Sequence, residues 1–253
     1  MKIRNIICML FVAIIPLTIL SAQTKVIAHR GYWDCEGSAQ NSIASLQKAQ
    51  ELRIYGSEFD VWMTSDNVLV VNHDATAEGL RIEDTPYVQL KDIRLKNGEQ
   101  LPTLEAYLRQ GKKDQKTKLI LELKSHSTKD KEDRAVAAVV KMVKKAGVKK
   151  QTEYISFSLN ICKELVRLDQ KAKVAYLNGD LNPQELKAIK IPGIDYHYTV
   201  LQKNKHWIEE ARQLKMTVNV WTVNNEADMQ EMIAAGVDFI TTDKPVVAKE
   251  WVK

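Results

Sequence analysis

The feature that most constrains the fold of this chain is a regular alternation of short β-branched runs with longer helical patterns. Eight runs have the length and composition of strands: Val26–His29, Ser57–Met63, Lys118–Lys124, Glu153–Phe157, Lys173–Leu177, Gly193–Tyr198, Thr217–Trp221 and Phe239–Thr242. Helical patterns lie between them: Ser42–Leu52, Thr103–Gln110, Lys131–Ala146, Asn160–Asp169, Pro183–Ile189, His206–Leu214 and Glu226–Ala235. Because each helix returns the chain to the same edge of a sheet, strands connected in this way pair in parallel.

Eight such units in a chain of 253 residues predict an α/β fold of the closed (β/α)8, or TIM-barrel, type. A doubly wound open sheet is the alternative architecture. A further extended run, Val68–His73, follows the second strand, and residues 75–102 are the longest irregular stretch. We expect this region to be a short insertion that crosses one face of the barrel. No linker or repeat divides the chain, so a single domain is expected over residues 23–253.

The first 22 residues have the organisation of a secretory signal peptide. Two basic residues precede an uncharged and mostly apolar run over residues 6–20, and the small residues Ser21 and Ala22 follow it. This run is shorter than the roughly 20 residues that span a bilayer, although an uncleaved N-terminal anchor is the alternative. We therefore expect cleavage near Ala22, no stable membrane span afterwards, and a periplasmic or secreted protein.

The charge of the remaining chain is nearly balanced. The full chain has 37 basic and 32 acidic residues, and two of the basic residues lie in the signal segment. The remaining chain therefore has a net charge of +3. No basic stripe is interleaved with aromatic residues, so we expect no nucleic-acid partner. Cys35 and Cys162 remain after cleavage; export permits a disulfide, but we expect two unpaired thiols.

Acidic residues stand near the ends of two predicted strands. Glu58 and Asp60 are two apart on the second strand and therefore project from the same face, and Glu122 and Lys124 repeat this pattern on the third. Glu122 alone is equally consistent with a buried ion pair. Carboxylates that crowd together in one barrel interior repel one another unless a cation or a proton intervenes. Because all these ligands are oxygens, we expect one divalent cation, Ca²⁺ or Mg²⁺.

Two histidines also follow extended runs. His29 ends the first strand, and His73 ends the run after the second, where Asp74 either orients it or caps the next loop. Trp221 closes the seventh strand and either walls a pocket or packs in the core. The segment 243–245 follows the eighth strand and is a weaker candidate for the site, because it can equally be a turn that starts a helix, with proline at the first helical position. His197 and His206 have no partner pattern and are interpreted as structural or surface residues, and His126, which follows Lys124 closely, lies beyond the strand end and is not assigned to the site.

Taken together, these residues resemble the glycerophosphodiester phosphodiesterase family. The resemblance rests on an ordered set of motifs over nearly the whole chain: His29-Arg30-Gly31, Glu58-x-Asp60, His73-Asp74, Leu101-Pro102-Thr103-Leu104-Glu105, Glu122-Leu123-Lys124, Trp221-Thr222-Val223-Asn224 and Thr242-Asp243-Lys244-Pro245. It implies a TIM barrel and hydrolysis of small-molecule glycerophosphodiesters to glycerol 3-phosphate and an alcohol.

The resemblance also implies a role for each matching residue. His29 and His73 would be the acid–base pair; Glu58, Asp60 and Glu122 would bind the metal; Arg30 and Lys124 would hold phosphate oxygens; and Gln40, Asn41 and Trp221 would line the substrate pocket. One position departs from the family pattern. The family usually has Glu-Asn-Thr where this chain has Gln40-Asn41-Ser42, and the glutamine keeps the size but loses a negative charge.

Two other functions remain open. A phospholipase of C or D type, acting on intact lipid headgroups, has a similar barrel, and Tyr32 and Trp33 near the mouth leave it possible, although no amphipathic basic helix supports membrane binding. A catalytically idle barrel that binds phosphodiesters is favoured only by Gln40. The two histidines and three acids argue against it, because binding alone needs no acid–base pair.

Overall fold

The computed structural model describes residues 23–252, so the expected signal peptide lies outside the described residues. Its largest sheet contains eight parallel strands: β1 (Lys25–Ala28), β2 (Gly56–Met63), β6 (Lys118–Leu123), β7 (Thr152–Ser156), β8 (Val174–Tyr176), β9 (Gly193–His197), β10 (Thr217–Trp221) and β11 (Phe239–Thr242). Each strand pairs with the next in this order, and β1 pairs with both β11 and β2, which closes the ring. The predicted TIM barrel is confirmed, and the open-sheet alternative is wrong.

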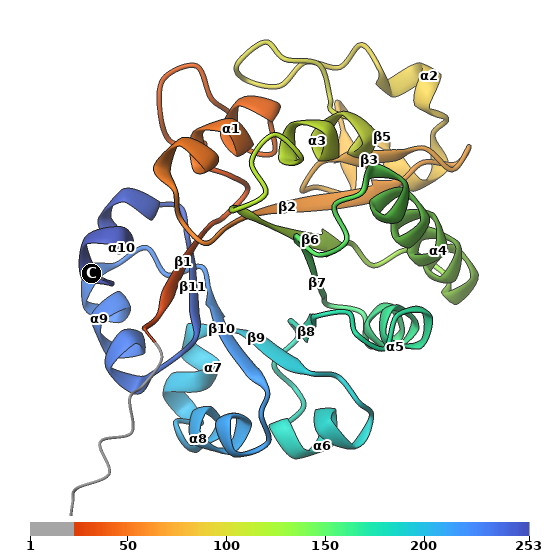
Figure 1. Ribbon diagram of the computed structural model, residues 1–253. Coiled ribbons are helices and arrows are strands. Elements are labelled where there is room, and N and C mark those ends of the chain that lie inside the picture. Colours follow the sequence, from red (N-terminus) through yellow and green to blue (C-terminus); the bar gives the residue numbers. More distant parts are fainter. Residues whose placement is uncertain (1–22, 253) are drawn as a thin grey trace, which may run out of the picture.

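Helices surround the ring of strands (Figure 1). They are α1 (Ile43–Leu52), α3 (Leu104–Gly111), α4 (Lys129–Ala146), α5 (Leu159–Leu168), α6 (Pro183–Ala188), α7 (Tyr198–Lys203), α8 (His206–Gln213), α9 (Glu226–Ala235) and α10 (Pro245–Trp251). Most begin at a side chain that caps the first turn; Thr103, for example, accepts a hydrogen bond from Ala106 N. The predicted ranges differ by one or two residues, except that α7 is additional and Tyr198 begins it rather than ending β9.

Residues 64–103 leave the barrel after β2 and form the insertion drawn beside α2 in Figure 1. Strand β3 (Leu69–Val71) pairs antiparallel with β2. The stretch expected to be irregular contains β4 (Thr76–Ala77), β5 (Leu80–Arg81), a 3-10 helix η1 (Ile82–Asp84) and α2 (Tyr87–Leu90). Most of the stretch is irregular, as predicted, but these short elements were missed, because elements of two to four residues are too short to leave a periodic pattern. They enclose a small apolar cluster of their own, separate from the main core.

The direction of each side chain in the barrel follows from the two-residue period of its strand. Apolar residues such as Phe59 and Leu121 face outward and pack under the helices in the main core. The alternate residues face the barrel axis; Ile27, Ile120 and Ile155 form an apolar cluster there. At the carboxyl ends of the strands this inward face becomes polar. The strand register places Asp60 directly opposite Glu122 on the neighbouring strand.

Two further expectations concern the chain outside the barrel interior. Cys35 and Cys162 are both free thiols, as predicted. Over the residues that the structure describes, no helix has the length and apolar character needed to cross a bilayer.

Candidate active site

Three acidic side chains converge at the carboxyl end of the barrel. Glu58 and Asp60 come from β2 and Glu122 from β6, all three are buried, and each offers an oxygen within 4.8 Å of the others. Asn41 fixes the position of Asp60: its side chain donates to Asp60 Oδ2 at 2.8 Å and accepts from Asp60 N at 3.1 Å. The structure thus brings together the three residues that the sequence assigned to a metal.

Two cations lie against these carboxylates. Lys124 Nζ is 2.7 Å from Asp60 Oδ1 and 2.7 Å from Glu122 Oε1. Arg30 Nε lies 3.9 Å from Asp60 Oδ2, and the Arg30 backbone N–H donates to Glu58 Oε2 at 2.7 Å. The two residues expected to hold phosphate are therefore at the same end of the barrel as the acids, and the positive charges of Lys124 and His73 both lower the pKa of Asp60.

The electrostatics of the cluster fit a divalent cation. Burial raises the pKa of Glu58 well above its ordinary range, and the nearby charges of Asp60 and Glu122 raise it further. Its Oε1 is buried and has no hydrogen-bond partner among the described residues. Burial opposes ionisation of Asp60, but the charges of Lys124 and His73, together with hydrogen bonds from Lys124 and Asn41, lower the pKa of that carboxyl. Buried carboxylate oxygens that crowd together, with Glu58 Oε1 left without a donor, are the kind of set that binds Ca²⁺ or Mg²⁺.

The pH dependence of stability provides a test of this crowding. Burial, and then the charge of Asp60, raise the pKa of Glu122 to about 8 from its ordinary value of 4.5, despite Lys124. Between these values the folded protein holds a proton that the unfolded chain has lost, so stability is full below the lower pKa and falls as pH rises toward the higher. We expect metal-free protein to unfold in less urea at about pH 8 than at about pH 5.

The variant Glu122→Gln has no such proton to lose and is expected to show a flatter urea midpoint over the same range of pH. The exposed Glu250→Gln is the matched control and should keep the wild-type slope. Equal slopes in wild type and Glu122→Gln would show that the Glu122 carboxyl does not have the raised pKa.

His29 is oriented by the carboxylate of Asp243, which lies between β11 and α10. His29 Nδ1 lies 2.8 Å from Asp243 Oδ1, and Asp243 also accepts from Trp33 Nε1 at 3.0 Å and from Asn224 Nδ2 at 2.7 Å. Burial opposes ionisation of Asp243, but these hydrogen bonds, that of His29 foremost, lower its pKa to about 2. An ionised carboxylate only accepts, so Nδ1 carries the proton and the lone pair lies on Nε2.

Asp243 is the site residue whose contact the sequence reasoning missed. The segment does begin a helix, since α10 starts at Pro245 as expected. The contact with His29 arises because β11 and β1 pair to close the barrel, which brings positions 28 and 242 into register. The sequence feature that could have identified Asp243 is its place directly after the eighth strand, because polar side chains at the carboxyl ends of barrel strands lie at the barrel mouth.

Replacing Asp243 by asparagine is expected to lower kcat by about 10- to 100-fold, because the amide can donate to Nδ1 and stabilise the wrong tautomer of His29. KM should change little, since Asp243 has no direct contact with a substrate in this account. The measurement is steady-state kinetics, with Asp130→Asn on the exposed face of α4 as control. An unchanged kcat in Asp243→Asn would mean that the tautomer of His29 does not matter.

His73, which follows β3, is also oriented by a carboxylate. Its Nδ1 lies 2.7 Å from Asp74 Oδ1, so Asp74 orients it. Burial lowers the pKa of His73, although the charge of Asp60 opposes this shift. The two charges are thus close enough to influence each other. Because its pKa is lowered, His73 favours the neutral form more than a free imidazole does, and neutral His73 can accept a proton at Nε2.

A groove of about 580 Å³ runs beside the acids and is lined by His73, Arg30, Asn41 and residues of the insertion. Gln40 is exposed at its edge, where its Oε1 accepts from Arg30 at 2.8 Å. Trp221 lies outside this groove on β10; its Nε1 donates to the Asp195 carbonyl, and its ring packs edge-on against His197 and Phe157. The substrate-pocket roles of Gln40, Asn41 and Trp221 stay predictions.

Comparison with known proteins identifies the family of this chain. The sequence model of the "Glycerophosphoryl diester phosphodiesterase family" matches residues 29–247. A crystal structure of a glycerophosphodiester phosphodiesterase from Parabacteroides distasonis has 52% sequence identity and a TM-score of 0.91, and the match covers 92% of this chain and 98% of that one. A glycerophosphodiester phosphodiesterase of Caldanaerobacter subterraneus is 28% identical over 88% of this chain and 95% of its own.

A third protein resembles the chain in fold alone. The phosphodiesterase of Oleispira antarctica, solved with the product sn-glycerol-3-phosphate, has 22% identity, a TM-score of 0.78 and coverage of 90% and 96%. The family match spans all five of the predicted metal and acid–base residues. The chain therefore belongs to the glycerophosphoryl diester phosphodiesterase family and is a hydrolase of that family.

Proposed function

We propose that this protein is an exported enzyme that hydrolyses glycerophosphodiesters to glycerol 3-phosphate and an alcohol, with one divalent cation held by Glu58, Asp60 and Glu122. The observation that carries the proposal is the convergence of these buried carboxylates at one end of the barrel, together with two histidines that each have an orienting carboxylate. A protein that only binds a phosphodiester would have no use for two histidines oriented in this way. Export rests on the first 22 residues, and N-terminal sequencing of secreted protein would test it.

In the proposed mechanism the histidines move the protons. One imidazole accepts a proton at Nε2 from the attacking oxygen, and the other donates a proton from Nε2 to the departing alkoxide. Asp243 and Asp74 hold the rings in the Nδ1–H tautomer and stabilise the positive charge that forms on the base. The attacking oxygen belongs either to water or to a hydroxyl of the substrate, in which case a cyclic phosphate would form first.

The phosphate needs positive partners in this acidic site. Arg30 can turn its guanidinium toward the groove, where only the exposed Gln40 now accepts from it. Lys124 contributes a second positive charge from its position between Asp60 and Glu122. A bound divalent cation would supply Lewis-acid stabilisation of the charge that develops on the non-bridging oxygens.

Metal removal tests the proposal. Purified protein is incubated with glycerophosphocholine, and glycerol 3-phosphate is measured before chelation, after chelation with EDTA and after addition of Ca²⁺ or Mg²⁺. We expect release that is lost on chelation and returns with one of the two ions, because the carboxylates alone repel the anionic substrate. Intact phosphatidylcholine vesicles serve as the second substrate. Turnover of vesicles alone, or turnover unaffected by chelation, would contradict the proposal.

A further inference from the structure

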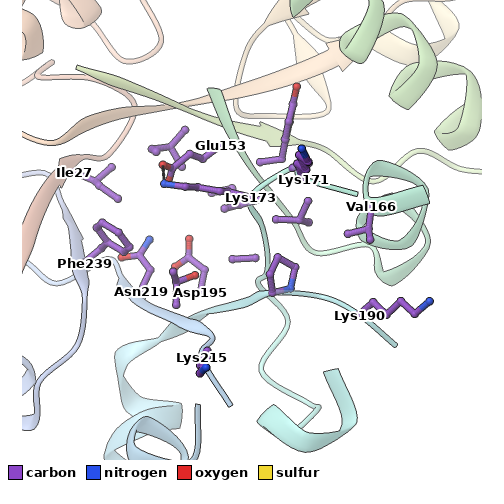
Figure 2. Close-up of a pocket in the computed structure, with 18 of the residues that line it drawn as sticks. Ile27, Glu153, Val166, Lys171, Lys173, Lys190, Asp195, Lys215, Asn219 and Phe239 are labelled. Carbon is purple, nitrogen blue, oxygen red and sulfur yellow. Dashed lines mark hydrogen bonds and ion pairs between the residues drawn. The ribbon is translucent and has the colours of Figure 1, made fainter. Parts of the chain in front are cut away.

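A second cavity lies inside the barrel at the end opposite to the carboxylates. It has a volume of about 330 Å³ and is lined by residues at the amino-terminal ends of β7 to β11 and the connections that precede them (Figure 2). The proposed reaction uses none of these residues. Its walls are largely apolar, with Ile27, Ile155 and Phe239 among them. The volume falls at the lower end of the range of small-molecule sites.

The inner end of this cavity contains a buried carboxyl. Asp195 faces inward from β9 and is 1% exposed. Its Oδ1 has no hydrogen-bond partner among the described residues, and the neighbouring Asn219 uses its amide to donate to Thr241 Oγ1 at 3.0 Å. Figure 2 shows the side chains of Asp195 and Asn219 directed into the space between the lining residues. Burial raises the pKa of Asp195 to about 7, although a hydrogen bond with the Asn219 side chain opposes this shift.

The outer end of the cavity has the opposite charge. Lys171, Lys190 and Lys215 line it and are exposed, and no carboxylate within residues 23–252 lies within 4.0 Å of their ammonium groups. A fourth lysine behaves differently: Lys173 pairs with Glu153 at 2.8 Å. The cavity thus has an acid inside it and largely apolar walls, and three exposed lysines stand on separate sides of its rim (Figure 2).

We propose that this cavity is a second binding site, for a short zwitterion whose ammonium group pairs with Asp195 and whose anionic group reaches the rim, where one of the exposed side chains of Lys171, Lys190 and Lys215 pairs with it. The chemical class is an ω-amino acid or an aminoalkyl phosphate with a short methylene chain. A simple anion would satisfy the lysines but leave the Asp195 oxygen unpaired. A simple cation would have to pass three lysines. The apolar walls match the methylene chain between the two charges.

The test measures binding of 4-aminobutyrate and 6-aminohexanoate to the full protein by isothermal titration calorimetry. Hexanoate lacks the ammonium group and hexylamine lacks the anionic group, so each removes one of the two contacts. We expect at least one ω-amino acid to bind about tenfold or more tightly than hexanoate and hexylamine. The variant Asp195→Asn should lose about tenfold in affinity, because the amide keeps the shape but not the charge.

A second variant avoids the barrel interior. Lys171→Gln, Lys190→Gln and Lys215→Gln are combined and compared with the equally exposed set Lys141→Gln, Lys163→Gln and Lys203→Gln, which lies outside the cavity. The first set should weaken binding and the second should not. Binding that is equal in Asp195→Asn, in both lysine sets and in wild type would overturn the proposal. So would the absence of any heat at millimolar ligand, or a crystal structure with the probe beside His73.

Discussion

His29→Ala and His73→Ala are each expected to lower kcat by about 10²- to 10⁴-fold, the usual loss when a positioned acid or base is removed. The physical reason is that, in the proposed mechanism, no other side chain replaces the missing imidazole as the proton acceptor for the attacking oxygen or as the proton donor for the leaving alkoxide. His206→Ala is the matched control, because that histidine is exposed on α8 and makes no contact with the site. Thermal unfolding should be nearly unchanged in the control.

The same two variants can assign the roles of the histidines. A nitrophenyl diester has a leaving group that departs without a proton, so the variant that lacks the acid should recover most of its activity on this substrate. The variant that lacks the base should remain slow on both substrates. Near wild-type turnover in both variants with glycerophosphocholine and metal present would refute the two-histidine mechanism.

Glu58→Gln is expected to have opposite effects on activity and on metal-free stability. Activity should fall by about 10³-fold, because the amide is a weaker ligand for a hard cation. Metal-free stability near neutral pH should rise by on the order of 1 kcal/mol, because the variant no longer holds a crowded carboxyl in the folded state. Both effects follow from burial of Glu58 beside Asp60 and Glu122.

Saturating metal should reverse the order of stability. A ligand at 100 times its dissociation constant stabilises the wild type by about 2.7 kcal/mol, and the variant gains less. Thermal unfolding with EDTA and with Ca²⁺ or Mg²⁺ measures both states, and Glu250→Gln on the surface is the control. A variant that is less stable than wild type in EDTA would show that the three acids are a stabilising hydrogen-bond cluster instead of a metal site.

Much of the barrel could be predicted because its strands leave a strong local pattern. In β2, every second residue is apolar and packs outward, so Glu58 and Asp60 had to share the inner face. Parallel strands then bring their carboxyl ends together, which placed Glu122 near them without any knowledge of distances. The insertion was harder, since β4 and β5 have two residues each and their position depends on the apolar cluster around Ile82 and Leu90.

The contacts that the sequence did not reveal depend on closure of the ring. Asp243 and His29 are 214 positions apart and meet only because β11 pairs with β1. Gln40 was expected in the substrate pocket, and its contact with Arg30 depends on the path of the loop between β1 and α1. Asp195 lies on a strand that was predicted correctly, but the sequence gives no measure of whether a buried carboxyl finds a partner.

The central claim, one cation bound by three carboxylates between the two histidines, is tested most directly by anomalous diffraction from crystals soaked in Mn²⁺, which replaces Mg²⁺ at oxygen sites. The account predicts a single strong peak in contact with oxygens of Glu58, Asp60 and Glu122. A peak elsewhere, or no peak while Lys124 still bridges Asp60 and Glu122 in active crystals, would contradict it.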